Sequence, residues 1–150
     1  MKQTIWWDMD GTIADLYGVP NWLTYLQAED SFPYEEAAVM HNMAQLAKLM
    51  NKVQQAGYKL GIISWLSKTS TASYDKSVTE AKLGWLSQHL HSVHFDAIHI
   101  VAYGTPKATF IETENDILFD DEEKNRADWT GIAYEPNKII TILKQLLKGE

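Results

Sequence analysis

Two aspartates near the start of the chain, Asp8 and Asp10, have the spacing of groups that act together. They follow an apolar stretch at 5–7, and Gly11 comes next, a pattern typical of a buried strand that ends in a turn. Residues two apart on an extended backbone point the same way, so both carboxylates can serve one site. Two close carboxylates repel unless a cation or a shared proton neutralises them. Because Mg²⁺ prefers carboxylate and carbonyl oxygens and often binds beside a phosphate, we expect a magnesium site here.

The rest of the chain alternates strand and helix patterns. Apolar stretches at 58–65, 95–103, 116–119 and 130–134 predict strands, and apolar residues at helical spacing predict helices over 44–53, 76–90 and after Pro136. Such alternation favours a single α/β domain over 1–150, a three-layer sandwich around a Rossmann-like parallel sheet. Ligands of such sheets bind beyond the carboxyl ends of the strands. The polar residues expected at that edge are Asp8, Asp10, Ser64, Lys107, Asp120 and Asp121.

The segment 16–42 differs from the rest of the chain in composition, because it contains five aromatic residues and two prolines. Pro20 and Pro33 predict two short helices, one over 21–28 and one opening near Tyr34. The aromatic side chains could form a wall over the site or could simply pack the insert onto the domain.

The sequence Asp-Met-Asp-Gly-Thr at 8–12 resembles the nucleophile motif of the haloacid dehalogenase superfamily of phosphohydrolases. The resemblance implies that Asp8 is the nucleophile and a metal ligand, and that the Asp10 side chain transfers protons while its backbone carbonyl binds Mg²⁺. It also implies that Thr12 contacts the substrate phosphate and that 16–42 is a small helical cap.

Later residues match further motifs of that superfamily. Ser64 resembles the second-motif hydroxyl, which donates to a phosphate oxygen, and Lys107 the third-motif lysine, for which Lys68 and Lys82 are rivals. The doublet at 120–121 resembles the fourth motif, with Asp121 implied as the metal ligand and Asp120 as an outer or water-mediated partner; which of the two binds directly stays open.

A closer resemblance is to the 5'(3')-deoxyribonucleotidases, carried by the stretches 80–86, 103–109 and 115–121. It implies a phosphatase acting through an aspartyl-phosphate on a nucleoside monophosphate or a similar small phosphate ester. The cap is shorter than in those enzymes, and bulky Trp65 stands where they carry a small hydroxyl residue. The alternatives are an open-site phosphatase acting on a nucleic-acid end or a phosphoprotein, and a non-catalytic phosphate-sensing module.

Composition narrows the choice of partners. A formal net charge of -7 argues against nonspecific nucleic-acid binding. The chain has no cysteine, which removes thiolate chemistry and cysteine zinc sites. There is no apolar signal region and no stretch of membrane-spanning length, so we expect a cytoplasmic protein without a membrane partner. The oligomeric state cannot be read from the sequence.

Overall fold

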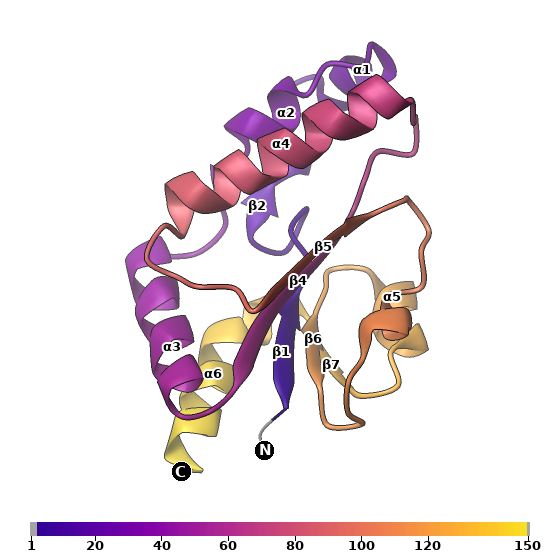
Figure 1. The fold of residues 1–150 in the computed structure, drawn as a ribbon. Coiled ribbons are helices and arrows are strands. Elements are labelled where there is room, and N and C mark those ends of the chain that lie inside the picture. The colour runs from indigo at the N-terminus through magenta and orange to yellow at the C-terminus, as the bar shows by residue number, and fades with distance from the viewer. Residues whose placement is uncertain (1–2, 150) are drawn as a thin grey trace.

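The computed structural model describes residues 3–149, and its centre is a five-stranded parallel sheet with the strand order β5-β4-β1-β6-β7. Helices α3 and α6 cover one face (Figure 1). The strands are β1 (Thr4–Trp7), β2 (Ala14–Asp15), β3 (Ala38–Val39), β4 (Lys59–Trp65), β5 (Ala97–Val101), β6 (Ile117–Phe119) and β7 (Ile132–Tyr134). The helices are α1 (Trp22–Gln27), α2 (Phe32–Glu36), α3 (Met43–Gln55), α4 (Ala72–His89), α5 (Glu123–Asp128) and α6 (Ile139–Lys148).

Strand β1 lies in the middle of the sheet and is buried on both faces. Ile5 and Trp7 belong to the cluster shared with α3 and α6, whereas Trp6 packs on the other side with Leu118 and Trp129. Alternate side chains of a strand point to opposite faces, which explains why the strand is apolar throughout. The predicted α/β fold with a parallel sheet is confirmed.

Several element boundaries differ from the predictions. Helix α4 begins at Ala72 rather than near 76, because the Thr71 side chain accepts a hydrogen bond from the Tyr74 amide and caps the helix. Helix α5 and the two-residue strands β2 and β3 were not predicted, since such short elements carry too few residues for a periodic pattern. No helix within 3–149 combines the length and apolar character needed to cross a bilayer.

The insert forms a small cap that stands on α4. Its stem is the antiparallel pair β2 and β3, and between them come the two predicted short helices α1 and α2. Helix α2 lies along α4 (Figure 1). The Tyr74 hydroxyl donates to the Asp30 carbonyl oxygen at 3.0 Å, and the Thr71 hydroxyl donates to Glu29. These bonds fix the cap relative to the sheet edge where β1 ends.

Asp116 joins the amino-terminal ends of β1 and β6, at the edge of the sheet away from Asp8. Its fully buried carboxylate accepts four hydrogen bonds: from the Thr4 amide, the Trp6 indole, the Glu112 amide and the Thr113 hydroxyl. Burial opposes ionisation, but these bonds outweigh it and hold the pKa of Asp116 below its ordinary value. The carboxylate therefore contributes stability that is lost as the pH falls below about 4.

We expect Asp116→Asn to lower the free energy of unfolding by about 3 kcal/mol at pH 7, because the amide nitrogen meets donors in place of acceptors. Urea unfolding followed by circular dichroism measures this. The matched control is Glu114→Gln, an exposed change in the same turn. A difference between Asp116→Asn and wild type that did not shrink between pH 7 and pH 3 would contradict the role of the carboxylate.

Candidate active site

The turn after β1 brings the first two aspartates to the carboxyl edge of the sheet. Gly11 has a φ of 79°, and its amide donates to the Ala14 carbonyl oxygen at 2.8 Å. A Cβ at Gly11 would lie 2.2 Å from Asp121 Oδ2, so the glycine is needed both for the backbone conformation and for the close approach of Asp121.

Three carboxylates gather where β1 and β6 end side by side. Asp8 and Asp120 follow the paired residues Trp7 and Phe119, and Asp121 comes next. One oxygen from each of the three acids lies within 4.8 Å of the others. A set of hard carboxylate oxygens suits Mg²⁺, so the residues present fit the predicted cofactor. The ligand roles themselves stay predictions.

Lys107 is the cation built into this cluster. It comes from the 3₁₀ turn Lys107–Phe110 and donates to Asp8 Oδ1 at 2.8 Å and to Asp120 Oδ2 at 2.7 Å. Burial alone would lower the pKa of Lys107, but the two carboxylates outweigh it and raise the pKa above its ordinary value. The lysine is therefore charged and balances part of the negative charge.

Lys107 does not neutralise the whole cluster. Burial, with the charge of Asp8, raises the pKa of Asp121 to about 8. The same two causes raise the pKa of Asp120 to about 6, although Lys107 opposes them. Raised pKa values mean that the cluster has an excess of negative charge, which a bound divalent cation would relieve.

Asp10 is not part of this three-acid group and forms an ion pair with a different lysine. Lys82 of α4 donates to Asp10 Oδ2 at 2.7 Å and to Ser64 Oγ at 2.6 Å. Burial raises the pKa of Asp10, and the nearby Lys82 ammonium opposes that rise without cancelling it. A carboxyl group whose pKa is raised suits a group that gives and takes protons.

The structure brings the predicted site residues to one edge, but two hydroxyls have unexpected partners. Thr12 donates to Asp8 Oδ2 at 2.9 Å, and Ser64 accepts from Lys82. Both residues are fully buried, and neither is among the described residues that line the cavity above the site. Their predicted phosphate contacts stay predictions, and the contacts observed are with the acids and lysines of the site.

The rival lysines have different positions. Lys107 donates to Asp8, Lys82 is buried and donates to Asp10, and Lys68 is exposed and lines the cavity. Asn125 of α5 was not predicted: its amide donates to Asp120 Oδ2 at 3.2 Å. Only its place five residues after Asp120 could have pointed to it.

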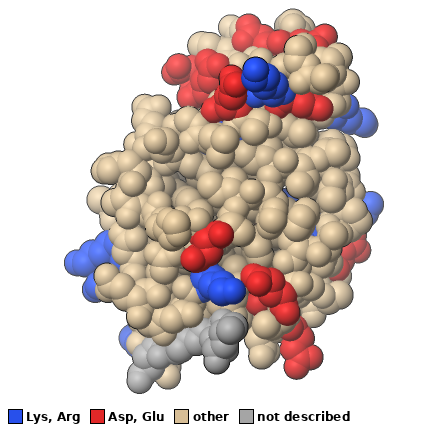
Figure 2. Space-filling model, viewed as in Figure 1, with Lys and Arg blue, Asp and Glu red and all other residues tan. Residues whose placement is uncertain are grey.

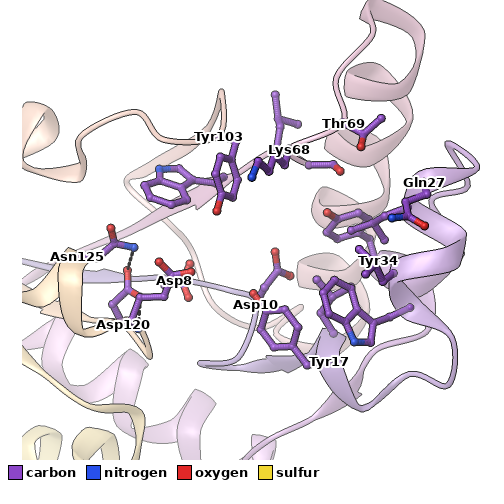
Figure 3. A pocket seen from close by; sticks show the side chains of 18 of the residues that line it. Asp8, Asp10, Tyr17, Gln27, Tyr34, Lys68, Thr69, Tyr103, Asp120 and Asn125 are labelled. Atoms are coloured by element: carbon purple, nitrogen blue, oxygen red, sulfur yellow. Dashed lines mark hydrogen bonds between the residues drawn. The ribbon is translucent and has the colours of Figure 1, made fainter.

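A cavity of about 310 Å³ lies between the acids and the cap. In Figure 3, Asp8, Asp120 and Asn125 lie at one end, and Gln27 and Tyr34 of the cap lie at the other. The apolar cap residues that line it are Leu16, Tyr17, Trp22, Leu23, Leu26 and Tyr34. Trp65, Leu66 and Tyr103 line it from the main domain. The insert therefore builds one wall of the site.

Comparison with known proteins shows similarity in fold. No protein-family model and no curated protein matches the sequence. The structure of D,D-heptose 1,7-bisphosphate phosphatase from Burkholderia thailandensis matches with a TM-score of 0.52 and 15% identity over 85% of this chain and 72% of that chain. A chain of the Pnkp1/Rnl/Hen1 complex matches with a TM-score of 0.52 and 16% identity over 88% of this chain, which spans 45% of that chain.

A third structure, the HAD domain of effector protein Lem4 from Legionella pneumophila, has a TM-score of 0.46 at 14% identity over 98% of this chain and 94% of that chain. The match to the first of these structures shows that this chain has the same fold as a known phosphatase.

We expect Mg²⁺ to stabilise the protein more at pH 8 than at pH 5.5. In chelator, the raised pKa values of Asp120 and Asp121 mean that the folded state binds more protons than the unfolded state between about pH 4 and 8, so their contribution to stability falls as the pH rises. Saturating Mg²⁺ replaces those protons and should raise Tm at pH 8 by about 5 °C.

Thermal unfolding with EDTA or MgCl₂ at both pH values measures this effect. Asp121→Asn should remove most of the Mg²⁺ increment, whereas Asp128→Asn, at an exposed position of α5, should keep it. Equal increments at the two pH values, or an undiminished increment in Asp121→Asn, would contradict a cation site in this cluster.

Proposed function

We propose that this protein is a Mg²⁺-dependent phosphomonoesterase that works through an aspartyl-phosphate on Asp8. The observation that supports the proposal is that the two aspartates of the first motif have different surroundings. Asp8 lies in the carboxylate cluster and is paired with Lys107, whereas Asp10 lies outside the cluster and is paired with Lys82. Phosphoryl transfer needs a positioned nucleophile, charge balance and a proton for the leaving oxygen. Asp8, Lys107 and Asp10 can supply these three functions from the same edge of the sheet.

The chemistry has two steps. An Asp8 carboxylate oxygen attacks phosphorus, the bond between phosphorus and the ester oxygen breaks, and Asp10 gives its proton to the departing alkoxide. Water then attacks the phosphorus of the aspartyl-phosphate while the Asp10 carboxylate takes the proton of the water, which releases inorganic phosphate and restores Asp8. Thr12 and Lys107 orient Asp8 through one oxygen each.

Asp8 and Asp121 would hold Mg²⁺, with Asp120 as a direct or outer partner and with the backbone carbonyl of Asp10 as the family resemblance implies. When bound, the ion supplies positive charge for the phosphate oxygens. The Lys107 ammonium, which donates to Asp8 and Asp120, supports the same charge balance.

The cavity favours a small substrate with a flat or apolar group. Its volume of about 310 Å³ is at the small end of the range for small-molecule sites, roughly 300–1,000 Å³. Aromatic side chains such as Tyr17 and Tyr103 offer stacking surfaces, and Gln27 offers an amide at the far end (Figure 3). A nucleoside monophosphate, as for a 5'-nucleotidase, combines a phosphate with a planar base in this way.

The acidic surface of the cap disfavours a long polyanionic substrate. Figure 2 shows acidic side chains gathered at the cap end of the molecule. The exposed acids of α2 and the loop before it are Glu29, Asp30, Glu35 and Glu36. A nucleic-acid strand leaving the cavity on this side would meet like charge. We therefore rank an open-site phosphatase that acts on a nucleic-acid end or a phosphoprotein as the second candidate function. A non-catalytic phosphate sensor is the third. The predicted cytoplasmic location stays a prediction.

We expect phosphate release from nucleoside monophosphates to need Mg²⁺ and to fall at least about 10³-fold in Asp8→Asn, since the amide cannot act as the nucleophile. A phosphate-release assay over a panel of nucleotides and sugar phosphates, with and without EDTA, measures this. Asp128→Asn should retain full activity.

Including a 5'-phosphorylated oligonucleotide and a phosphopeptide in the panel separates the alternatives. Higher kcat/KM on either macromolecular substrate would move the assignment to an open-site phosphatase. Undiminished turnover in EDTA would refute the proposed mechanism, and a wild-type protein inert on every ester with Mg²⁺ present would favour the sensor.

A further inference from the structure

Lys82 is a buried cation with every ammonium proton engaged. It donates to Asp10 Oδ2 at 2.7 Å, to Ser64 Oγ at 2.6 Å and to the Trp65 carbonyl oxygen at 2.8 Å. Its side chain is 1% exposed, and the ammonium lies 5.0 Å from the centre of the Tyr34 ring. Since an ammonium has three protons, these acceptors fix its position completely.

Packing does not explain a lysine at this place. Within α4, which the structure describes in full, Lys82 is the one charged residue among the buried ones, and its helical neighbours Val78 and Trp85 belong to the core. An unbranched apolar side chain would fill the same volume without the desolvation cost of an ammonium, which amounts to several kcal/mol before pairing. The polar contacts are therefore what distinguishes the lysine from an apolar residue here.

Those contacts decide where the Asp10 carboxylate lies. Asp10 is two residues from Asp8, yet among the described residues its side chain is not part of the three-acid group. Lys107 binds Asp8 and Asp120, and Lys82 binds Asp10 from the side of β4 and α4. The two lysines thus divide four acids into a cluster and a separate carboxylate that lines the cavity.

We infer that Lys82 is a positioning residue, which holds the Asp10 carboxylate in the cavity, away from the three-acid cluster, where it can reach the leaving oxygen. The inference rests on the proposed phosphomonoesterase function. It assigns Lys82 a function separate from that of Lys107, since Lys82 acts through Asp10 and Lys107 contacts Asp8.

The test compares leaving groups. In Lys82→Met, release of an alcohol from an alkyl phosphate should slow about 100-fold under single-turnover conditions, because the departing alkoxide needs a proton from Asp10. Release of p-nitrophenol from its phosphate should change less than about threefold, because that phenolate leaves without a proton. The loss should lie in the rate of the step, with the substrate concentration at half-maximal rate unchanged.

Matched variants separate positioning from general damage. Lys76→Met, on the exposed face of α4, should leave both rates unchanged. Because the chain has no cysteine, Lys82→Cys can be alkylated selectively with 2-bromoethylamine while unfolded and then refolded, which restores an ammonium at nearly the same distance. This treatment should restore the alkyl phosphate rate. If Lys82→Met fails to fold by circular dichroism, Lys82→Gln is used with the same expectation.

Equal losses for the two substrates, or no loss for the alkyl phosphate, would overturn the role of Lys82 while leaving the phosphatase function standing. A wild-type protein inactive on both substrates would overturn the proposed function and this inference together.

Discussion

The packing of four carboxylates at one edge of a parallel sheet is the constraint on which this structure depends. Asp8, Asp120 and Asp121 lie within a few ångströms of one another because β1 and β6 are neighbours that end together. Such a group would be strongly unfavourable without compensating charge. Lys107 supplies part of it through its ion pairs with Asp8 and Asp120. The pKa values of Asp120 and Asp121 are still raised, so a further positive charge would be favourable.

The cap gives this charged centre its surroundings. The cap is held on α4 through Tyr74 and Thr71, and its aromatic side chains line the cavity that also contains Asp8 and Asp10. Apolar walls lower the local dielectric constant and so strengthen the interactions of the charges beside them. The same helix, α4, supports the cap at one end and carries Lys82 into the site, so the shape of the cavity and the position of Asp10 depend on one element.

The sequence was informative where periodicity and strand ends determine structure. The apolar stretch before Asp8 and the alternation of strands and helices sufficed to predict the parallel sheet and the shared edge of Asp8, Lys107 and Asp120. It was less informative about side-chain partners. Whether Lys82 or Lys107 would bind Asp8 depends on which face of α4 meets β4, and Lys82 lies at a position whose neighbours on the helix are apolar.

Burial explains the remaining differences. Thr12 and Ser64 stand in the predicted motifs, but their exposure depends on the layers packed above them, which no spacing reveals. Helix α5 carries Asn125, whose amide donates to Asp120, but the helix is too short to produce a periodic signal in the sequence. The elements that could be predicted are thus those set by local pattern, and the contacts that could not are those set by tertiary packing.

The most direct test of the central claim is to stop the reaction with acid during turnover in Mg²⁺ and to locate the phosphoryl group by mass spectrometry. Reduction with borohydride marks the residue, since an aspartyl-phosphate becomes homoserine. If the proposed mechanism operates, one residue is modified, Asp8. A phosphoenzyme modified at Asp10 or Asp120, or turnover with no trapped phosphoenzyme on any residue, would contradict it.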